Sequence, residues 1–581
     1  MAAETKTEIQ ESTAEERIEH SKVEESTAEP VVKLDSYRDD NHINLTWRSW
    51  MVVFVTCFAI MGQVYVVVAA GSVIGFIIRD LGDPAIAGWI IQGPLLMQSV
   101  LSPIVGRLSD VLDRKYLAIV PTAISFVGAI VSAKATNMAT LIGGGILVGF
   151  TLATIAIVQA IPSEVLPLKF RALANGFAFL GGAVGGLVGS LGAGAATNSN
   201  ASGWRTIFWI QAGFFAITII GLLLFYHPKK VTDTPKLSLK EIMWACDPIG
   251  SSLFIVGATL TLLALDWAGG SYTWHSNHVV APLVVGLVSL LAFAIYEWKG
   301  RNDGLVAHAF FKRGPNFSLS VFAFAVEGWI FYSAVNSVTP LIVLHLGFET
   351  DAWLISVRQL SYTLVTLTVS VPIMLWATWK KDLKSPLLIS FVFFLAVSIC
   401  YACINPSMKN AQIGFNIISG IGQSGPLTLL VALVQFTAPH AYLSTATGLA
   451  FSARALGGAF GSAVLNAIIN GKISSTYVPA VSSAATNAGL PITSIPDLLK
   501  ALESGAGFAE VPGVNDKILG SAISASQNAY AAAYRLAWAS IIPFVVLSIV
   551  AVAFLKGVKE LMTEHVEATV EHVEVQEKTA V

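Results

Sequence analysis

Hydrophobic positions in this chain form long runs that charged residues do not interrupt. Trp50 to Ile78 and Val279 to Tyr296, for example, contain no Asp, Glu, Lys or Arg. A run of about 20 apolar residues is long enough to cross the hydrocarbon core of a bilayer, which is about 30 Å thick. The pattern predicts about fourteen membrane helices, so the expected fold class is an all-α polytopic membrane protein. The predicted helices cover residues 48–78, 85–106, 115–133, 139–161, 171–195, 204–226, 247–267, 279–298, 316–345, 353–378, 385–404, 411–437, 444–469 and 536–556.

Positive charges between these helices are concentrated in every second loop. The basic loops contain Arg107, Arg114, Lys115, Lys169, Arg171, Lys229, Lys230, Lys236, Lys240, Lys299, Arg301, Lys312, Arg313, Lys380, Lys381 and Lys384. The short loops between them contain little beyond Arg79, Lys134, Arg205 and Lys409. Because Lys and Arg are enriched in cytosolic loops, the basic loops are predicted to face the cytosol. An even number of helices then places both termini on that side.

Composition supports a membrane protein and argues against several other classes. Of the 581 residues 54% are hydrophobic and only 12% are charged, and the mean hydropathy is +0.67. A soluble chain of this length would carry more charge, and we expect a lipid bilayer rather than nucleic acid as partner. The four cysteines lie in or beside apolar runs and indicate neither a disulfide framework nor a zinc site. They are Cys57, Cys246, Cys400 and Cys403.

Motifs for enzymatic chemistry are not evident. The phosphate-binding pattern G-x-x-x-x-G-K-[ST] does not occur, so ATP is not the expected driving force. No metal-ligand spacing and no nucleophile pattern stands out either. We therefore expect no metal, no cofactor and no enzymatic activity.

One apolar, glycine-rich stretch occurs twice. Gly176 to Ser190 reads GFAFLGGAVGGLVGS, and Gly448 to Ser462, 272 residues later, reads GLAFSARALGGAFGS. Val158-Gln159 similarly corresponds to Val434-Gln435 once a four-residue gap is allowed. The repeat relates the fifth helix to the thirteenth, which predicts two six-helix halves with two helices inserted between them. Parallel repeats on this scale are typical of secondary transporters that move two halves around a central site.

This duplication defines the predicted domains. The halves are residues 46–226 and 299–556, separated by a cytosolic linker at 227–246 and by the inserted helices at 247–298. A long extracytosolic loop is expected at 470–535. The polar tails, residues 1–45 and 557–581, are predicted to be disordered and cytosolic.

Glycines spaced four residues apart recur in both copies of the repeat. This spacing lets helix backbones approach closely, and its presence at equivalent places in both halves favours a moving interface over static packing. The candidate interface glycines are Gly182, Gly185, Gly186, Gly189, Gly457 and Gly461.

A second motif lies in the basic loop after the second helix, which reads GRLSDVLDRK from Gly106 to Lys115. It resembles the loop signature of the major facilitator superfamily, G-x-L-x-D-R-x-G-R-[RK]. Gly106, Leu108, Asp110, Arg114 and Lys115 match it, whereas Val111 and Asp113 depart from it. The resemblance implies that this loop holds the two halves together in the outward-facing state. Asp382 and Lys384 belong to a weaker copy of the loop in the second half.

The resemblance extends over roughly residues 46–556 and is closest to fungal fourteen-helix drug:proton antiporters, in particular the trichothecene-efflux-pump-like branch and its siderophore-transporter relatives. The stretches that carry it are residues 45–48, 106–110, 161–176, 203–205, 273–286 and 326–329. It implies a monomeric, proton-driven transporter of a sizeable organic molecule in the plasma membrane or in a vacuolar or vesicular membrane. The family's antiporter signature carries a Gly-Pro pair in helix five, whereas Gly181 to Gly189 contains no proline. Export of a hydrophobic secondary metabolite, toxin or drug is the first interpretation; uptake of ferric siderophores and a non-transporting sensor are the alternatives.

Two charged residues lie deep inside predicted helices. Glu327 and Arg454 are each about ten residues from a helix end, which corresponds to a depth of about 15 Å, half the hydrocarbon thickness. An unpaired charge there would be costly, so we predict that they pair and that Glu327 carries the coupled proton. The alternative is a static ion pair that only joins the two helices.

In the resembling family, the first, fourth, ninth and twelfth helices line a central cavity. Gln63 and Gln423 reach a depth similar to that of Glu327, so the resemblance predicts that these three side chains face the cavity. The aromatic candidates for contact with an aromatic or terpenoid substrate are Tyr65, Trp329, Phe331 and Tyr332. The alternative for each ring is packing against lipid or neighbouring helices.

Overall fold

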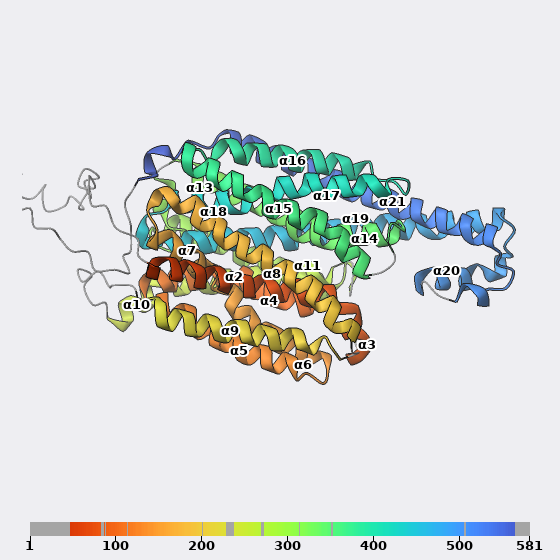
Figure 1. Ribbon diagram of the computed structural model, residues 1–581, viewed down its shortest axis with the longest axis horizontal. Helices are drawn as coiled ribbons and strands as arrows, with labels where there is room; N and C mark the ends of the chain where they lie inside the picture. The colour runs from red at the N-terminus through yellow and green to blue at the C-terminus, as the bar shows by residue number, and fades with distance from the viewer. Residues whose placement is uncertain are drawn as a thin grey trace, which may run out of the picture. The chain divides into compact units, whose positions relative to one another are not determined.

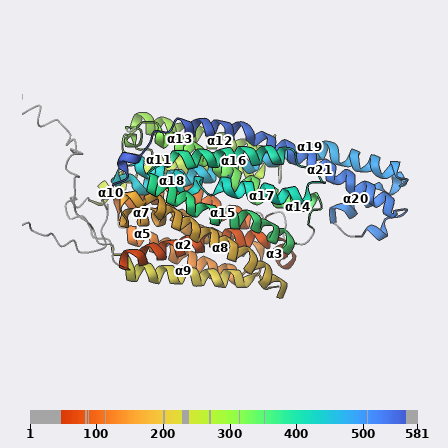
Figure 2. The ribbon, with the colours of Figure 1, turned by 45° about the horizontal axis from the view of Figure 1, so that its top comes forward.

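The computed structural model describes residues 47–563 except 83–85, 87–88, 113, 200–201, 228–237, 269–271, 313, 350–351 and 505–506. Both predicted tails therefore lie largely outside the described residues, as does Asp113. Within the described residues fourteen helical segments are long and apolar enough to cross a membrane. This confirms the expected number and the all-α class. The membrane helices run side by side, with α10 at one end of the bundle and α20 at the other (Figure 1, Figure 2).

The N-terminal group of membrane helices comprises α2 (Trp47–Ser72), α4 (Trp89–Val111), α5 (Arg114–Ala133), α6 (Met138–Ala153) with α7 (Ile155–Val165), α8 (Arg171–Ser199) and α9 (Arg205–Phe225). The inserted pair is α11 (Pro248–Trp267) and α12 (Asn277–Ile295), which ends in the π-helical turn η3 (Tyr296–Gly300). The C-terminal group comprises α13 (Asn316–Gly328) with η5 (Trp329–Val338) and α14 (Thr339–His345), α15 (Ala352–Lys380), α16 (Lys384–Ala402), α17 (Lys409–Gln423) with α18 (Pro426–Thr437), α19 (Leu443–Asn487) and α21 (Asp516–Ala553). The remaining helices are α3 (Ile74–Leu81), α10 (Leu239–Ala245), α20 (Ile495–Ser504) and the 3₁₀ turns η2 (Leu168–Phe170), η4 (His308–Phe311), η6 (His440–Tyr442), η7 (Ile492–Ser494), η8 (Phe508–Glu510) and η9 (Lys559–Leu561).

Three of the long helices change geometry in mid-course. The break between α6 and α7 falls at Thr154, whose hydroxyl donates to the carbonyl of Thr151 at 2.7 Å. The break between α17 and α18 falls just before Pro426, which has no backbone N–H to donate. The helix that starts as α13 becomes a π-helix at Trp329, two residues after Glu327. Such local π segments occur frequently at functional sites.

Residues 470–535 differ from the predicted loop. They contain the end of α19, all of α20 and the start of α21, and they form a helical hairpin beyond the membrane-spanning part of these helices (Figure 1). The hairpin has a small hydrophobic core of its own, which includes Val481, Leu498 and Ile518. Enough apolar side chains are present for this stretch to bury surface by itself, and helices satisfy its backbone hydrogen bonds, which an irregular loop of this length would leave to water.

The glycines of the two repeats pack helices within each group. A Cβ atom on Gly185 of α8 would overlap the carbonyl oxygen of Met61 in α2. A Cβ atom on Gly457 of α19 would overlap the carbonyl oxygen of Ala325 in α13 in the same way. The other candidates of α8 also face α2, since Gly182 and Gly186 face Val64 and Gly189 faces Tyr65. Gly461 of α19 faces Trp329, the first residue after α13. The two copies of the motif therefore build the same interface twice.

The first glycine of each copy contacts the opposite group instead. A side chain on Gly176 would overlap Met374 of α15, and one on Gly448 would lie 2.5 Å from the carbonyl oxygen of Ser102 in α4. Each copy thus combines one contact between the groups with several contacts inside its own group.

We expect Gly185→Leu and Gly457→Leu to destabilise the protein by about 3 kcal/mol or more, because backbone carbonyl groups occupy the space that the new side chain needs. The measurement is the melting temperature of purified protein, with size-exclusion chromatography of the heated samples as the readout. Gly192→Leu and Gly471→Leu are matched controls on α8 and α19, since nothing lies within 4 Å of a Cβ atom at either glycine. Equal melting temperatures for the Gly185 and Gly192 variants would contradict the packing account.

Candidate functional site

Glu327 and Arg454 form a fully buried ion pair between α13 and α19. The guanidinium binds both carboxylate oxygens, with Nε 2.5 Å from Oε2 and Nη2 2.9 Å from Oε1. Glu327 has no exposed surface, and Arg454 is 4% exposed. Two parallel hydrogen bonds to a carboxylate are the strongest arrangement that arginine offers. The two charges that the sequence predicted to pair therefore contact each other directly.

Aromatic rings and one hydroxyl surround the guanidinium of Arg454. Nη1 donates to the hydroxyl of Tyr332 at 2.9 Å. The guanidinium carbon also lies 4.6 Å from the ring centre of Phe331, 4.7 Å from that of Tyr332 and 5.5 Å from that of Phe324. Cation–π contacts of this kind stabilise an arginine that has left water. Tyr332 and Phe331 belong to the π-helical segment η5, so the change of helix geometry brings them to the charge pair.

Gln423, at the end of α17, completes this group. Its amide nitrogen donates to Oε1 of Glu327 at 2.5 Å, whereas its own amide oxygen is buried and has no hydrogen-bond partner among the described residues. The structure thus brings together Glu327, Arg454, Tyr332 and Gln423, four of the predicted site residues.

The other two predicted residues of the site lie in the N-terminal group. The amide of Gln63 donates to the carbonyl of Thr151 at 2.7 Å and lies 3.4 Å from the hydroxyl of Thr154. The ring of Tyr65 is 1% exposed and packs edge-on against Phe214 of α9 at 5.2 Å. Tyr65 is therefore part of the packing between α2 and α9.

The repeated glycine interface shows that Gln63 and Glu327 occupy equivalent positions. Gly185 contacts Met61 and Gly457 contacts Ala325, so residues in α2 correspond to residues 264 positions later in α13. Gln63 then corresponds to Glu327, and each of them bonds to the broken helix of its own group. Arg454 corresponds to Gly182 in the aligned repeats. At the two positions that form the ion pair in the C-terminal group, the N-terminal group therefore has the uncharged residues Gln63 and Gly182.

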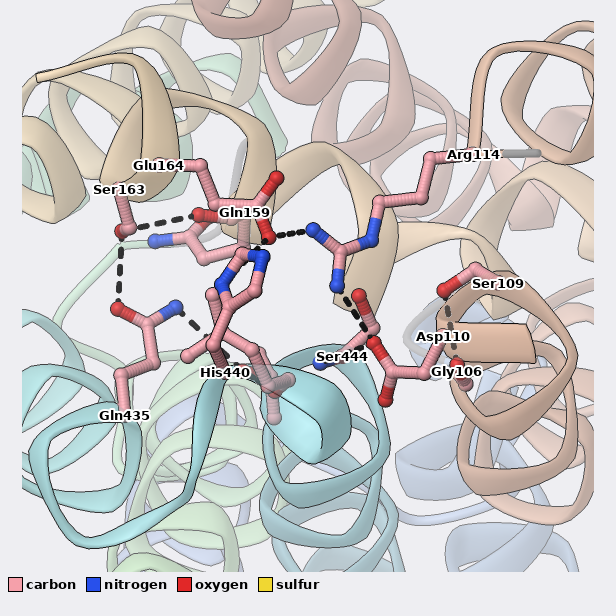
Figure 3. A network of polar contacts seen from close by, with 12 residues as sticks. Gly106, Ser109, Asp110, Arg114, Gln159, Ser163, Glu164, Gln435, His440 and Ser444 are labelled. Atoms are coloured by element: carbon pink, nitrogen blue, oxygen red, sulfur yellow. Dashed lines mark hydrogen bonds and ion pairs between the residues drawn. The ribbon is translucent and has the colours of Figure 1, made fainter. Parts of the chain in front are cut away.

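A second cluster joins the two groups at the end of the bundle that carries the basic loops, which we call the basic side. Asp110, in the last turn of α4, accepts hydrogen bonds at the start of α19 (Figure 3). Its oxygens lie 3.1 Å from the backbone N of Ser444, 2.7 Å from that of Thr445 and 2.7 Å from the hydroxyl of Thr445. The first N–H groups of a helix have no partners within the helix and favour a negative charge, so Asp110 caps α19.

Arg114 links this cap to Glu164, which lies outside the loop motif. Its guanidinium donates to Asp110 at 2.7 Å and forms an ion pair with Glu164 of α7 (Figure 3). His440 lies 4.0 Å from the same oxygen of Glu164. Glu164 lies in the stretch IPSEV and is 1% exposed. We refer to Asp110, Arg114, Glu164, Ser444 and Thr445 as the latch.

The remaining residues of the predicted gating loop have different roles. A Cβ atom on Gly106 would overlap the carbonyl oxygen of Ser444, so only glycine allows α4 to approach α19 this closely. Lys115 donates to the carbonyl of Leu223 at 3.0 Å, a contact inside the N-terminal group. Gly106 therefore supports the latch directly, whereas this hydrogen bond of Lys115 lies inside the N-terminal group.

Next to the latch, a cluster of buried amides and hydroxyls also crosses between the groups (Figure 3). The side-chain oxygen of Gln435 accepts from the hydroxyl of Ser163 at 2.9 Å and from the amide of Asn175 at 2.8 Å, while Arg171 donates to the Gln435 carbonyl at 3.0 Å. Gln159, the counterpart of Gln435 in the repeat, donates to Asn175 at 2.8 Å. Gln159 and Gln435, the equivalent residues of the two repeats, therefore both bind Asn175 where the two groups meet.

The C-terminal segment after α21 adds a third connection on the basic side. The backbone N of Lys169, in the N-terminal group, donates to the carbonyl of Thr563 at 2.8 Å. Lys381, in the C-terminal group, donates to the carbonyl of Met562 at 2.7 Å. Because these carbonyls are neighbours, the segment bridges the two groups, and the basic side of the described chain is closed by three sets of contacts.

Ion pairs of two carboxylates, Asp80 and Glu349, organise the opposite side. Asp80 accepts from the indole N–H of Trp204 at 2.9 Å and from Arg205 at 2.6 Å, and these two donors hold the pKa of Asp80 below its usual range. Glu349 accepts from Arg358 at 2.8 Å and lies 3.4 Å from Lys409, and the pKa of Glu349 is lowered mainly by the hydrogen bond from Arg358. Each pair stays within one group of helices and stabilises the loops there. Among the described residues, no three His, Cys, Asp or Glu side chains lie close enough together to hold a metal ion.

Comparison with known proteins agrees with this architecture. The chain is 26% identical over 553 residues to the MFS-type transporter prx5 of Penicillium rubens, which covers 93% of this chain and 94% of that protein. It is 25% identical over 524 residues to the trichothecene efflux pump TRI12 of Fusarium sporotrichioides, with 87% and 86% covered. Among solved structures, the proton:xylose symporter XylE bound to 6-bromo-6-deoxy-D-glucose superposes with a TM-score of 0.53 at 12% identity, covering 88% of this chain and 98% of that one, which shows the shared fold. The sequence model of the Major Facilitator Superfamily matches residues 49–462, and the chain therefore belongs to this family.

Proposed function

We propose that this transporter uses a proton gradient to export a hydrophobic organic compound such as a secondary metabolite, toxin or drug. The single observation that carries the proposal is the buried pair of Glu327 and Arg454, because a titratable carboxylate that joins two membrane helices can link proton binding to helix movement. Relatives named as efflux pumps support the direction of transport and the class of substrate. In this proposal the basic side is cytosolic and the membrane is the plasma membrane.

Protonation of Glu327 is the step that would release Arg454. Separating a buried ion pair leaves two uncompensated charges and costs about 3–5 kcal/mol, which would hold α13 and α19 together while Glu327 is ionised. A proton on Glu327 removes one of these charges. The Tyr332 hydroxyl and the surrounding rings still stabilise the guanidinium, so Arg454 keeps partners when Glu327 becomes neutral.

Gln423 suits both protonation states of Glu327. Its amide nitrogen donates to the ionised carboxylate, as observed. Its amide oxygen, which has no partner among the described residues, can accept from the protonated carboxyl group after the amide turns over. The carboxyl group therefore keeps a hydrogen-bond partner when its charge changes, which lowers the cost of protonation inside the bundle.

The latch would couple this event to the opening of the basic side. Arg454 and the capped residues Ser444 and Thr445 all belong to α19, so one rigid helix carries both the charge partner and the N-terminus that Asp110 binds. Any movement of α19 that follows protonation of Glu327 would therefore also change its contact with α4.

We expect Glu327→Gln to abolish uphill transport driven by a pH gradient while substrate exchange at equal concentrations persists, because the amide cannot take up a proton. The measurement uses the full chain in proteoliposomes, with a radiolabelled trichothecene as the first probe and a labelled ferric siderophore in a parallel arm. Glu560→Gln, an exposed glutamate on the basic side, is the control. Uphill transport by the Glu327→Gln protein would exclude Glu327 as the coupling site, and uphill movement of the siderophore towards the cytosolic side would favour uptake.

Asp110→Asn is expected to lower transport at least about tenfold while leaving membrane insertion intact. The neutral amide weakens three hydrogen bonds to the start of α19 and the ion pair with Arg114, and each charge-assisted hydrogen bond contributes about 1.5–3 kcal/mol. Asp382→Asn is a matched control, because the carboxylate of Asp382 accepts hydrogen bonds from the neighbouring backbone N–H groups of Lys384 and Ser385. Parental flux from a correctly localised Asp110→Asn protein would show that the latch does not limit transport.

A further inference from the structure

Two buried carboxyl groups lie at the basic side where the inserted helix pair begins and ends. Asp247 directly precedes α11, and Glu297 lies in η3 directly after α12. Asp247 has no exposed surface and Glu297 is 4% exposed. Neither residue is hydrogen-bonded to Glu327 or Arg454 or belongs to the latch, so both lie outside the proposed coupling of Glu327 to the latch.

The two carboxyl groups converge on the same glycine. A Cβ atom on Gly250 would lie 2.6 Å from Oε1 of Glu297 and 2.8 Å from Cγ of Asp247. Backbone N–H groups bind three of the four carboxylate oxygens: Gly250 donates to Oδ1 of Asp247 at 3.1 Å, Leu305 to Oδ2 of Asp247 at 3.3 Å, and Val306 to Oε2 of Glu297 at 2.9 Å. Oε1 of Glu297 is buried and has no hydrogen-bond partner among the described atoms. An acceptor without a donor therefore lies beside a second carboxyl group.

Nearby cations do not balance two negative charges. Arg301 is 3.5 Å from Asp247, but it binds the exposed Asp303 more closely, at 2.8 Å. The hydrogen bond from Arg301 lowers the pKa of Asp303. Arg107 donates only to the carbonyls of Ala245 and Asp303. The other titratable groups facing the pair are the phenol of Tyr296, the thiol of Cys246 and the ring of His308, whose Nε2 is 3.1 Å from the Glu297 carbonyl.

We propose that Asp247 and Glu297 form a proton-binding site on the basic side, in which the two carboxyl groups share one proton. Two like charges in one dry site cannot both persist, whereas a single proton supplies the donor that Oε1 of Glu297 lacks. The ligand is a proton from the cytosol, and this site is separate from the proton pathway through Glu327.

The position of this site allows it to act on the interface between the two groups. Ala258 and Phe254 of α11 pack in one cluster with Val100 of α4 and Leu456 of α19, so the inserted pair covers the line where α4 and α19 meet. Arg107 links the site to the start of α19, next to the latch. Its guanidinium lies 4.5 Å from the ring centre of Tyr442, the residue directly before α19. Loss of the shared proton would push the carboxyl groups apart and disturb the two carbonyls that hold Arg107.

Thermal unfolding of the full chain in lipid nanodiscs as a function of pH tests this proposal. The folded protein would hold a proton that the unfolded chain releases at neutral pH, so stability must fall as the pH rises, by up to about tenfold in the unfolding equilibrium per pH unit. The experiment uses the Glu327→Gln background, so that the coupling carboxylate does not contribute. Adding Glu297→Gln should remove this pH dependence, whereas adding Glu560→Gln should not.

Infrared difference spectroscopy gives a second measurement if the Glu297 variant folds poorly. In the Glu327→Gln background, the C=O stretch of a protonated carboxylic acid should be present at neutral pH and should disappear at alkaline pH. In the Asp247→Asn variant the band should disappear at a lower pH, because removal of the neighbouring negative charge favours the ionised form of Glu297. The proposal is overturned by a stability that does not change with pH in the background protein, or by the absence of the infrared band. Either result would leave the role of Glu327 untouched.

Discussion

The cost of placing a charge in an apolar bundle dominates the organisation of this transporter. Glu327 and Arg454 meet with two short hydrogen bonds, and the remaining surface of the guanidinium is covered by a phenol hydroxyl and aromatic rings. Three helices must keep their relative positions for these contacts to persist. The π-helical geometry after Glu327 and the break before Pro426 both lie next to this pair, so irregular backbone occurs where the charges have to be satisfied.

The duplicated architecture explains why only one group of helices carries this pair. The glycines of both repeats build the same close contact, between α8 and α2 and between α19 and α13. On that common scaffold Gln63 stands opposite Gly182, and Glu327 stands opposite Arg454. The groups therefore differ in two side chains at equivalent positions and in the backbone after Glu327, where α13 continues as the π-helical segment η5 while α2 stays α-helical.

Three sets of polar contacts on the basic side join the two groups of helices. The latch, the amide cluster around Gln435 and the C-terminal segment all join the N-terminal group to the C-terminal group. They are polar contacts at helix ends rather than interlocked apolar side chains, and water can replace their hydrogen bonds when the interface opens. Close helix packing also crosses between the groups, since a Cβ atom on Gly448 of α19 would lie 2.5 Å from the carbonyl oxygen of Ser102 in α4.

Local hydrophobicity and spacing along the chain were enough to predict the helix count, the duplication, the loop motif and the presence of two charges far from the helix ends. The sequence by itself could not show that Tyr65 packs against Phe214, that residues 470–535 fold into a hairpin, or that Glu164 joins the latch. Those outcomes depend on which face of one helix meets another, and no local pattern records that. The tertiary structure alone decided that Asp247 and Glu297, 50 residues apart, lie side by side, since only the packing of α11 against α12 brings the two ends of the inserted pair together.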